Sequence, residues 1–227
     1  ERDEFLLTLH VANFNFRDGG PWEEIILGLP EQITELNRNR AYFLWFLSGV
    51  LFMFGIYNIA MSILQRKGSS GFFLGLLCLD LFVRGVVTSE RFLVQLVPEL
   101  NWEVLMKVDY LTFYVGVPLF AIFIRGVFPR EFGSNAYRLA IIVGFLMCGF
   151  VIVTPAILYS HSLMPYQVFT GLFIAYGLFS VVRAIHNQQE GAWLVLMGYA
   201  TLAVAVVNDI LDTQNIINTG YVYHLGA

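Results

Sequence analysis

Long apolar stretches, nearly free of charge, alternate with short polar segments along this chain. Six such stretches cover residues 41–64, 71–89, 110–124, 139–159, 163–182 and 192–207. A helix needs about 20 apolar residues to cross a hydrocarbon core that is about 30 Å thick. The third and sixth stretches reach that length when their flanks are included. The pattern therefore predicts six membrane-spanning helices joined by short loops.

The beginning of the chain follows a different pattern. Residues 5–12 alternate between apolar and polar side chains as a strand does, and Asp18-Gly19-Gly20-Pro21 is a strong turn signal. Residues 23–28 then read as a second strand. An isolated hairpin is only marginally stable in water. We therefore expect residues 1–30 to supply the last strands of a β-domain whose other strands precede Glu1.

Residues 31–227 form the second predicted part, an all-α polytopic membrane helix bundle. No helix breaker separates the polar residues 31–40 from the first apolar stretch, so one helix is expected from about Glu31 to Leu64. Gly226-Ala227 reads as the start of a seventh span that this fragment would omit.

Composition excludes several classes of protein. Hydrophobic residues make up 57% of the chain, which is too many for a soluble domain. No basic run suggests nucleic acid as a partner. Cys78 and Cys148 lie inside apolar stretches, where thiols act as small apolar side chains. We expect no catalytic residues, no cofactor and no metal in this segment, because no nucleophile–base pair or H-E-x-x-H motif can be assembled.

Basic residues in the loops favour one orientation. With the β-domain outside, the inner loops hold more Lys and Arg than the outer segments do, as positively charged inner loops require. The inner set is Arg66, Lys67, Arg125, Arg130, Arg138 and Arg183, and the outer set is Arg38, Arg40, Arg91 and Lys107.

Ionisable residues inside the spans are the main candidates for function, because each costs at least about 2.5–3.5 kcal/mol at the centre of a bilayer. Asp80 and Arg84 are four residues apart and share one helix face, so a local ion pair is one interpretation. A second interpretation pairs Arg84 with Asp209, because both are predicted about 6–8 Å outward from the centres of their spans. Asp109 and Asp212 are further candidates for this polar network. Their two interpretations are the lining of a ligand cavity and ordinary polar helix ends.

Other residues within the spans have structural interpretations. Asn58, beside Tyr57 in the inner half, is expected to hydrogen-bond to a neighbouring helix, and both are candidates for helix packing. Pro118 and Pro155 are expected to kink the third and fourth spans. Glycines such as Gly144 supply surfaces for close helix packing.

Several short motifs, in this order and spacing, resemble one family. They are Val11-Ala12-Asn13-Phe14, Gly19-Gly20, Ile26-Leu27-Gly28, Gly55-Ile56-Tyr57-Asn58, Val83-Arg84-Gly85, Pro98-Glu99-Leu100-Asn101-Trp102, Phe128-Pro129-Arg130-Glu131-Phe132 and Asn208-Asp209-Ile210-Leu211. Together they are similar to the bacterial seven-transmembrane receptors with diverse intracellular signalling modules. In that family an extracellular jelly-roll sensory domain precedes seven helices, and a kinase, cyclase or phosphatase module follows them. The resemblance implies that residues 1–30 are the C-terminal strands of this extracellular β-sandwich.

The resemblance implies a signalling receptor in the bacterial inner membrane. It also implies a small-molecule or carbohydrate-like extracellular ligand and a homodimer, because such output modules dimerise. The lipid bilayer is the other expected partner. The alternative function is a small-solute transporter or channel, which would require an internal repeat and broken spans near the midplane.

Overall fold

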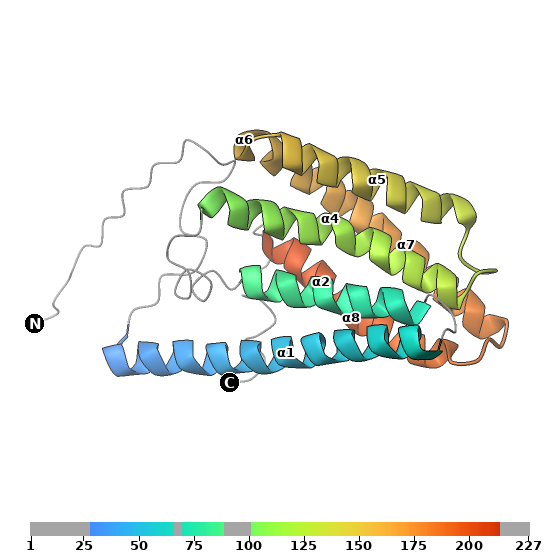
Figure 1. The fold of residues 1–227 in the computed structure, drawn as a ribbon, viewed down its shortest axis with the longest axis horizontal. Coiled ribbons are helices and arrows are strands. Elements are labelled where there is room, and N and C mark those ends of the chain that lie inside the picture. Colours follow the sequence, from blue (N-terminus) through green and yellow to red (C-terminus); the bar gives the residue numbers. More distant parts are fainter. Residues whose placement is uncertain (1–27, 66–69, 89–100, 214–227) are drawn as a thin grey trace, which may run out of the picture.

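The computed structural model describes residues 28–65, 70–88 and 101–213 (Figure 1). The helices are α1 (Pro30–Gln65), α2 (Ser70–Thr88), α4 (Trp102–Val127), α5 (Ser134–Val153), α6 (Ala156–Tyr159), the 3₁₀ turn η1 (Ser160–Ser162), α7 (Leu163–His186) and α8 (Ala192–Thr213). Within these ranges six helical segments are long and apolar enough to cross a membrane, with α6, η1 and α7 forming one of them. The prediction of a polytopic helical membrane protein is confirmed.

The spanning helices lie side by side, so the bundle has two ends (Figure 1). We call one the Arg84 end, where α1 begins, α2 ends and α4 begins. We call the other the Arg130 end, where α4 turns into α5 and α7 turns into α8.

Helix α4 is the centre of the described bundle. It packs against α2, α5 and α7, whereas α1 packs mainly against α2, and α8 packs mainly against α7. Its buried positions recur every three or four residues and include Met106, Tyr110, Tyr114, Val117 and Ala121. That spacing places them on one helical face, which is buried in the bundle.

Glycines let two pairs of helices approach closely. A Cβ added to Gly75 on α2 would stand 2.7 Å from the carbonyl oxygen of Gly55 on α1. A Cβ added to Gly144 on α5 would collide with the ring of Pro118 on α4. Small residues at such contacts allow the backbones to pack directly, and this close packing is one of the forces that drive helix association in lipid.

Large apolar side chains cover the outer faces of the bundle. Phe46 on α1 is 70% exposed, Phe145 on α5 is 79% exposed and Leu194 on α8 is 75% exposed. Hydrocarbon solvates such side chains, so these faces suit contact with lipid tails. A shallow, almost entirely apolar surface runs along α1 and is lined by Trp45, Phe46, Gly49, Val50, Met53, Phe54 and Tyr57.

Several sequence-based boundaries can now be compared with the structure. The single helix expected from Glu31 to Leu64 is confirmed by α1. The fourth span was placed wrongly, because it ends at Val153 rather than at residue 159. Pro155 is the reason: it has extended backbone angles and precedes α6, so it separates two spans instead of kinking one. Pro118 does lie inside a continuous helix, α4.

The predicted third span also began too late, because α4 starts at Trp102, eight residues before Tyr110. Asn101 caps this start by accepting a hydrogen bond from the Glu103 amide at 2.9 Å. The expected β-hairpin and the start of a seventh span lie outside the described residues.

Candidate functional site

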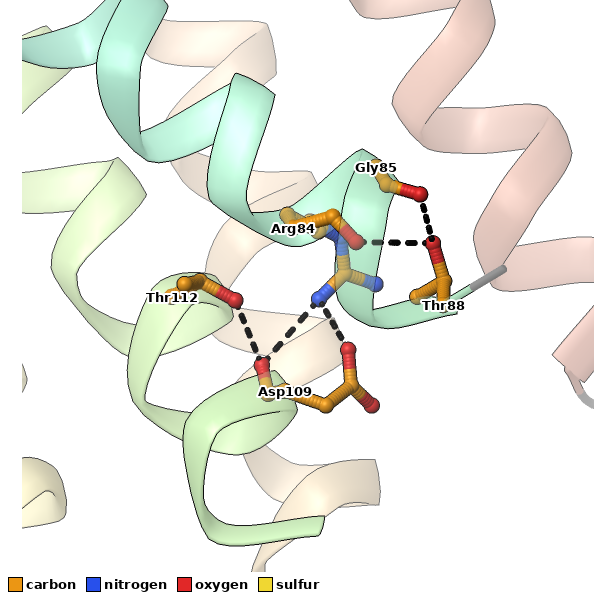
Figure 2. Close-up of polar contacts among 5 residues, drawn as sticks. All are labelled: Arg84, Gly85, Thr88, Asp109 and Thr112. Atoms are coloured by element: carbon orange, nitrogen blue, oxygen red, sulfur yellow. Dashed lines mark hydrogen bonds and ion pairs between the residues drawn. The ribbon is translucent and has the colours of Figure 1, made fainter. Parts of the chain in front are cut away.

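An ion pair joins α2 to α4 near the Arg84 end. The Arg84 Nη1 atom lies 3.0 Å from the Asp109 Oδ1 atom. The same nitrogen donates to the Asp109 backbone carbonyl at 3.3 Å. Figure 2 shows the Arg84 guanidinium on α2 directed at one carboxylate oxygen and at the backbone carbonyl oxygen of Asp109 on α4. The side chains are 27% and 25% exposed, so the pair is largely removed from solvent and lipid.

The surroundings of the pair hold both partners in place. The Arg84 guanidinium carbon lies 5.1 Å from the centre of the Phe113 ring, a cation–π distance. Thr112 donates its hydroxyl to the Asp109 carbonyl at 2.8 Å, and Thr88 donates to the Arg84 carbonyl at 2.8 Å (Figure 2). Each threonine hydroxyl thus donates to the backbone carbonyl of a charged residue on its own helix.

Each charge in this pair would be expensive alone, since a single ionised side chain in a span costs about 2.5–3.5 kcal/mol or more. Pairing lowers that cost and also ties two helices together at one point. A contact of this kind can transmit a displacement, because movement of α2 relative to α4 must either stretch the pair or carry both helices together.

The structure gives Arg84 a different cross-helix partner from the expected one. Among the described residues its ion pair runs to Asp109 and not to Asp209. The packing explains this result, because α2 lies against α4 whereas α8 lies mainly against α7. Asp209 is half-buried on α8 and has interactions of its own.

Asp80 and Asp212 are the remaining members of the predicted network. Asp80 sits one turn before Arg84, and its Oδ2 atom would lie 3.4 Å from a Cβ built on Gly116 of α4. Asp80 and Arg84 therefore both face α4. The side chain of Asp212 lies outside the described residues.

The two packing candidates on α1 behave differently from the expectation. Asn58 donates its amide to the Phe54 carbonyl of its own helix at 2.8 Å, so the bond that the structure shows is not to a neighbouring helix. Tyr57 is 59% exposed and contributes little to packing among the described helices.

A cluster of tyrosines in the middle of the bundle was not anticipated from the sequence. Tyr114, Tyr159 and Tyr166 are 0%, 0% and 2% exposed. The Tyr114 hydroxyl lies 2.7 Å from the Ser162 hydroxyl, which in turn donates to the Tyr159 carbonyl at 2.6 Å. The Tyr166 hydroxyl donates to the Tyr114 carbonyl at 2.9 Å. The available signal was the placement of tyrosine, rather than phenylalanine, within the apolar stretches.

The α4–α5 turn at the Arg130 end is also anchored firmly. Phe128 and Phe132 are each 1% exposed, and Phe132 packs edge-on against Phe173 and Tyr176 of α7. The Tyr176 hydroxyl accepts the Gly133 amide at 3.0 Å.

Polar contacts reinforce that turn. Arg125 donates to the Phe132 carbonyl at 3.3 Å, and the Asn187 amide donates to the buried Glu131 carboxylate at 3.3 Å. The turn therefore fastens α4 to the end of α7.

Within the described ranges, no group of three or more His, Cys, Asp or Glu residues is placed to hold a metal ion. The Arg84–Asp109 pair, the tyrosine cluster and the α4–α5 turn all hold neighbouring helices together.

Comparison with known proteins agrees with this description. The family model described as 7TM diverse intracellular signalling matches residues 40–227. No curated protein and no solved structure matches the chain. The matched region spans the six membrane-crossing segments and includes both the Arg84–Asp109 contact and the α4–α5 turn. The chain therefore belongs to the 7TM diverse intracellular signalling family of membrane receptors.

Proposed function

We propose that this chain is the membrane part of a receptor that senses a ligand outside the bacterial inner membrane and relays the signal to a cytoplasmic output module. The family match over residues 40–227 is the observation that carries the proposal. It favours a receptor over the transporter or channel alternative.

Within this proposal the Arg84 end faces the periplasm and the Arg130 end faces the cytoplasm. The exposed Arg130, Arg138 and Arg183 at the Arg130 end support this orientation, because Lys and Arg accumulate in cytoplasmic loops. The hairpin of residues 1–30 would then belong to an extracellular jelly-roll domain joined to the bundle through α1. A seventh span would complete the bundle, as the description of the family indicates.

The relay would run through α4. This helix is tied to α2 by Arg84 at one end and to the end of α7 through the α4–α5 turn at the other. A small solute or carbohydrate-like ligand bound outside would shift α1 and α2 first, and the Arg84–Asp109 pair would pass that shift to α4. Dimerisation through the output modules, with kinase, cyclase or phosphatase chemistry located there, would complete the pathway. This segment would have no catalytic activity of its own.

The test compares output in membranes that contain the full-length receptor. Membrane vesicles with the cytoplasmic face outward receive ATP or GTP, and phosphoprotein or cyclic nucleotide formation is measured. Arg84→Ala is expected to change the rate of product formation at least about threefold, since losing a coupling of typical allosteric size alters an equilibrium by that much or more. Arg38→Ala, in an exposed pair on α1, is the matched control.

Two results would count against the proposal. Equal output from Arg84→Ala and wild-type receptors at equal expression would show that the contact does not relay a signal. Solute flux through the bundle, with no nucleotide-dependent product, would favour the transporter instead.

A further inference from the structure

Pro118 creates a defect in the middle of α4. Proline has no backbone N–H, so the carbonyl four residues earlier, that of Tyr114, lacks the donor that a regular helix provides. No water is present in the hydrocarbon core to satisfy such a carbonyl. The structure must therefore supply a donor from elsewhere.

That donor comes from α7. The Tyr166 hydroxyl donates to the Tyr114 carbonyl at 2.9 Å, and Tyr166 is only 2% exposed. Its ring is held by Phe113 at 5.4 Å and by the Tyr114 ring at 4.4 Å between centroids. The hydroxyl is thus aimed at the carbonyl that the proline has freed.

Helix α5 also packs against the proline break of α4. The Pro118 ring packs directly against Gly144, and a Cβ added to that glycine would also stand 3.1 Å from the Tyr114 carbonyl oxygen. Three helices therefore meet at one backbone carbonyl.

The two halves of α4 on either side of Pro118 are anchored to different neighbours. The half that begins at Trp102 is bound to α2 through Asp109. The half that ends at Val127 is bound to the α4–α5 turn through Arg125. A weak point between two anchored halves is where a helix can bend.

We propose that Tyr166, Tyr114 and Pro118 form a conformational latch, in which the Tyr166 hydroxyl holds the proline break of α4 in the arrangement seen here. Release of this hydrogen bond lets the two anchored halves of α4 move relative to each other. The use of this movement in signalling depends on the proposed receptor function, but the latch itself does not.

A double-mutant cycle on the thermal unfolding of the purified chain tests the latch without ligand or output. Tyr166→Phe removes only the hydroxyl and is expected to lower Tm by roughly 3–8 °C, because it leaves a buried carbonyl unpaired. Pro118→Ala restores an N–H for the Tyr114 carbonyl. In the Pro118→Ala background the same Tyr166→Phe change should therefore lower Tm by less than half as much.

Tyr199→Phe is the matched control. Tyr199 is 4% exposed and its hydroxyl donates to the Ile174 carbonyl at 2.7 Å, which is a contact of the same type. Ile174 lies inside α7, where the N–H of Leu178 already serves its carbonyl. Loss of the Tyr199 hydroxyl should therefore lower Tm by less than loss of the Tyr166 hydroxyl does. The Pro118→Ala change should leave the decrease caused by Tyr199→Phe unchanged.

Hydrogen exchange gives a second, independent measurement that does not require the Pro118→Ala chain to fold. Amides of α4 near Pro118 should exchange at least about threefold faster in Tyr166→Phe than in Tyr199→Phe, since local opening sets the exchange rate. The latch is refuted if Tyr166→Phe lowers Tm equally in both backgrounds, or if exchange of α4 is the same in the two phenylalanine variants.

Discussion

At the scale of single residues, Arg84 shows how this bundle keeps a charge inside a membrane helix. Its guanidinium meets the carboxylate and the carbonyl of Asp109 and the face of the Phe113 ring. Three kinds of favourable contact thus converge on one cation. The expected consequence is strong energetic coupling between the two charged partners.

The first prediction measures this coupling. Arg84→Ala and Asp109→Ala should each destabilise the chain, because each leaves a partly buried charge without its partner. The double variant should lose less than the sum, with a coupling energy of about 1–3 kcal/mol in thermal unfolding.

Glu103 and Lys107 provide the control for that cycle. They form a pair at 3.2 Å on the same helix, but their side chains are 44% and 29% exposed and only four residues apart. Their coupling should be no more than about 0.5 kcal/mol. Additive losses at Arg84 and Asp109 would show that the contact contributes nothing to stability.

The second prediction concerns Gly144, where α5 touches the Pro118 ring. Gly144→Ala should destabilise the chain by about 1–3 kcal/mol, because an added methyl group must push the two helices apart. Gly149→Ala on the same helix has nothing within 4 Å of its new Cβ and should be neutral or slightly stabilising. Equal Tm values for the two variants would contradict the close packing of α4 and α5.

At the scale of elements, the α4–α5 turn is more firmly held than a connecting loop usually is. Its aromatic side chains are buried against α7. Its backbone accepts a hydrogen bond from Arg125 at Phe132 and donates one from Gly133 to the Tyr176 hydroxyl. These contacts fasten the turn to α7, so the turn joins α4 and α5 to α7 at the Arg130 end.

The third prediction tests that anchoring. Phe132→Ala removes a ring that is 1% exposed and should destabilise the chain by about 3–5 kcal/mol. Phe145→Ala on α5 removes a ring that is 79% exposed to the surrounding lipid or detergent, and it should have a much smaller effect. Thermal unfolding in one detergent compares the two, and similar losses would mean that the turn is not packed as described.

At the scale of the whole molecule, the basic residues of the Arg130 end set the proposed orientation. Crossing the membrane with Arg130, Arg138 and Arg183 is unfavourable, so these side chains are expected to stay in the cytoplasm. The chemistry at the two ends then differs. In the proposed orientation the Arg84 end would face the compartment that carries the ligand, and the Arg130 end would face the output module.

The fourth prediction is a labelling experiment in intact cells. In a chain with Cys78→Ala and Cys148→Ala, His161→Cys at the exposed Arg84 end should react with a membrane-impermeant maleimide. Asn135→Cys at the Arg130 end should react only after the cells are permeabilised. The reverse pattern would invert the proposed topology and remove the support for an external ligand site at the Arg84 end.

The class of fold can be predicted from the amino-acid sequence alone. Long uncharged runs leave a helix as the only way to satisfy the backbone in lipid, so the spans followed from composition and length alone. The continuous helix α1 also followed, because residues 31–64 contain neither proline nor a turn signal. The family resemblance came from motifs that remain recognisable without any structure.

Contacts between helices could not be predicted in this way, because they depend on which helices are neighbours in the folded bundle. Depth along each span placed Asp109 and Asp209 at similar levels, but it carried no information on which helix lies beside α2. Adjacency of α2 and α4 selected Asp109 as the partner of Arg84. The Tyr166–Tyr114 bond depends in the same way on α7 crossing α4 at Pro118. Such pairings arise from the packing of surfaces distant in sequence, and hydrophobic periodicity reports only which face of each helix is apolar.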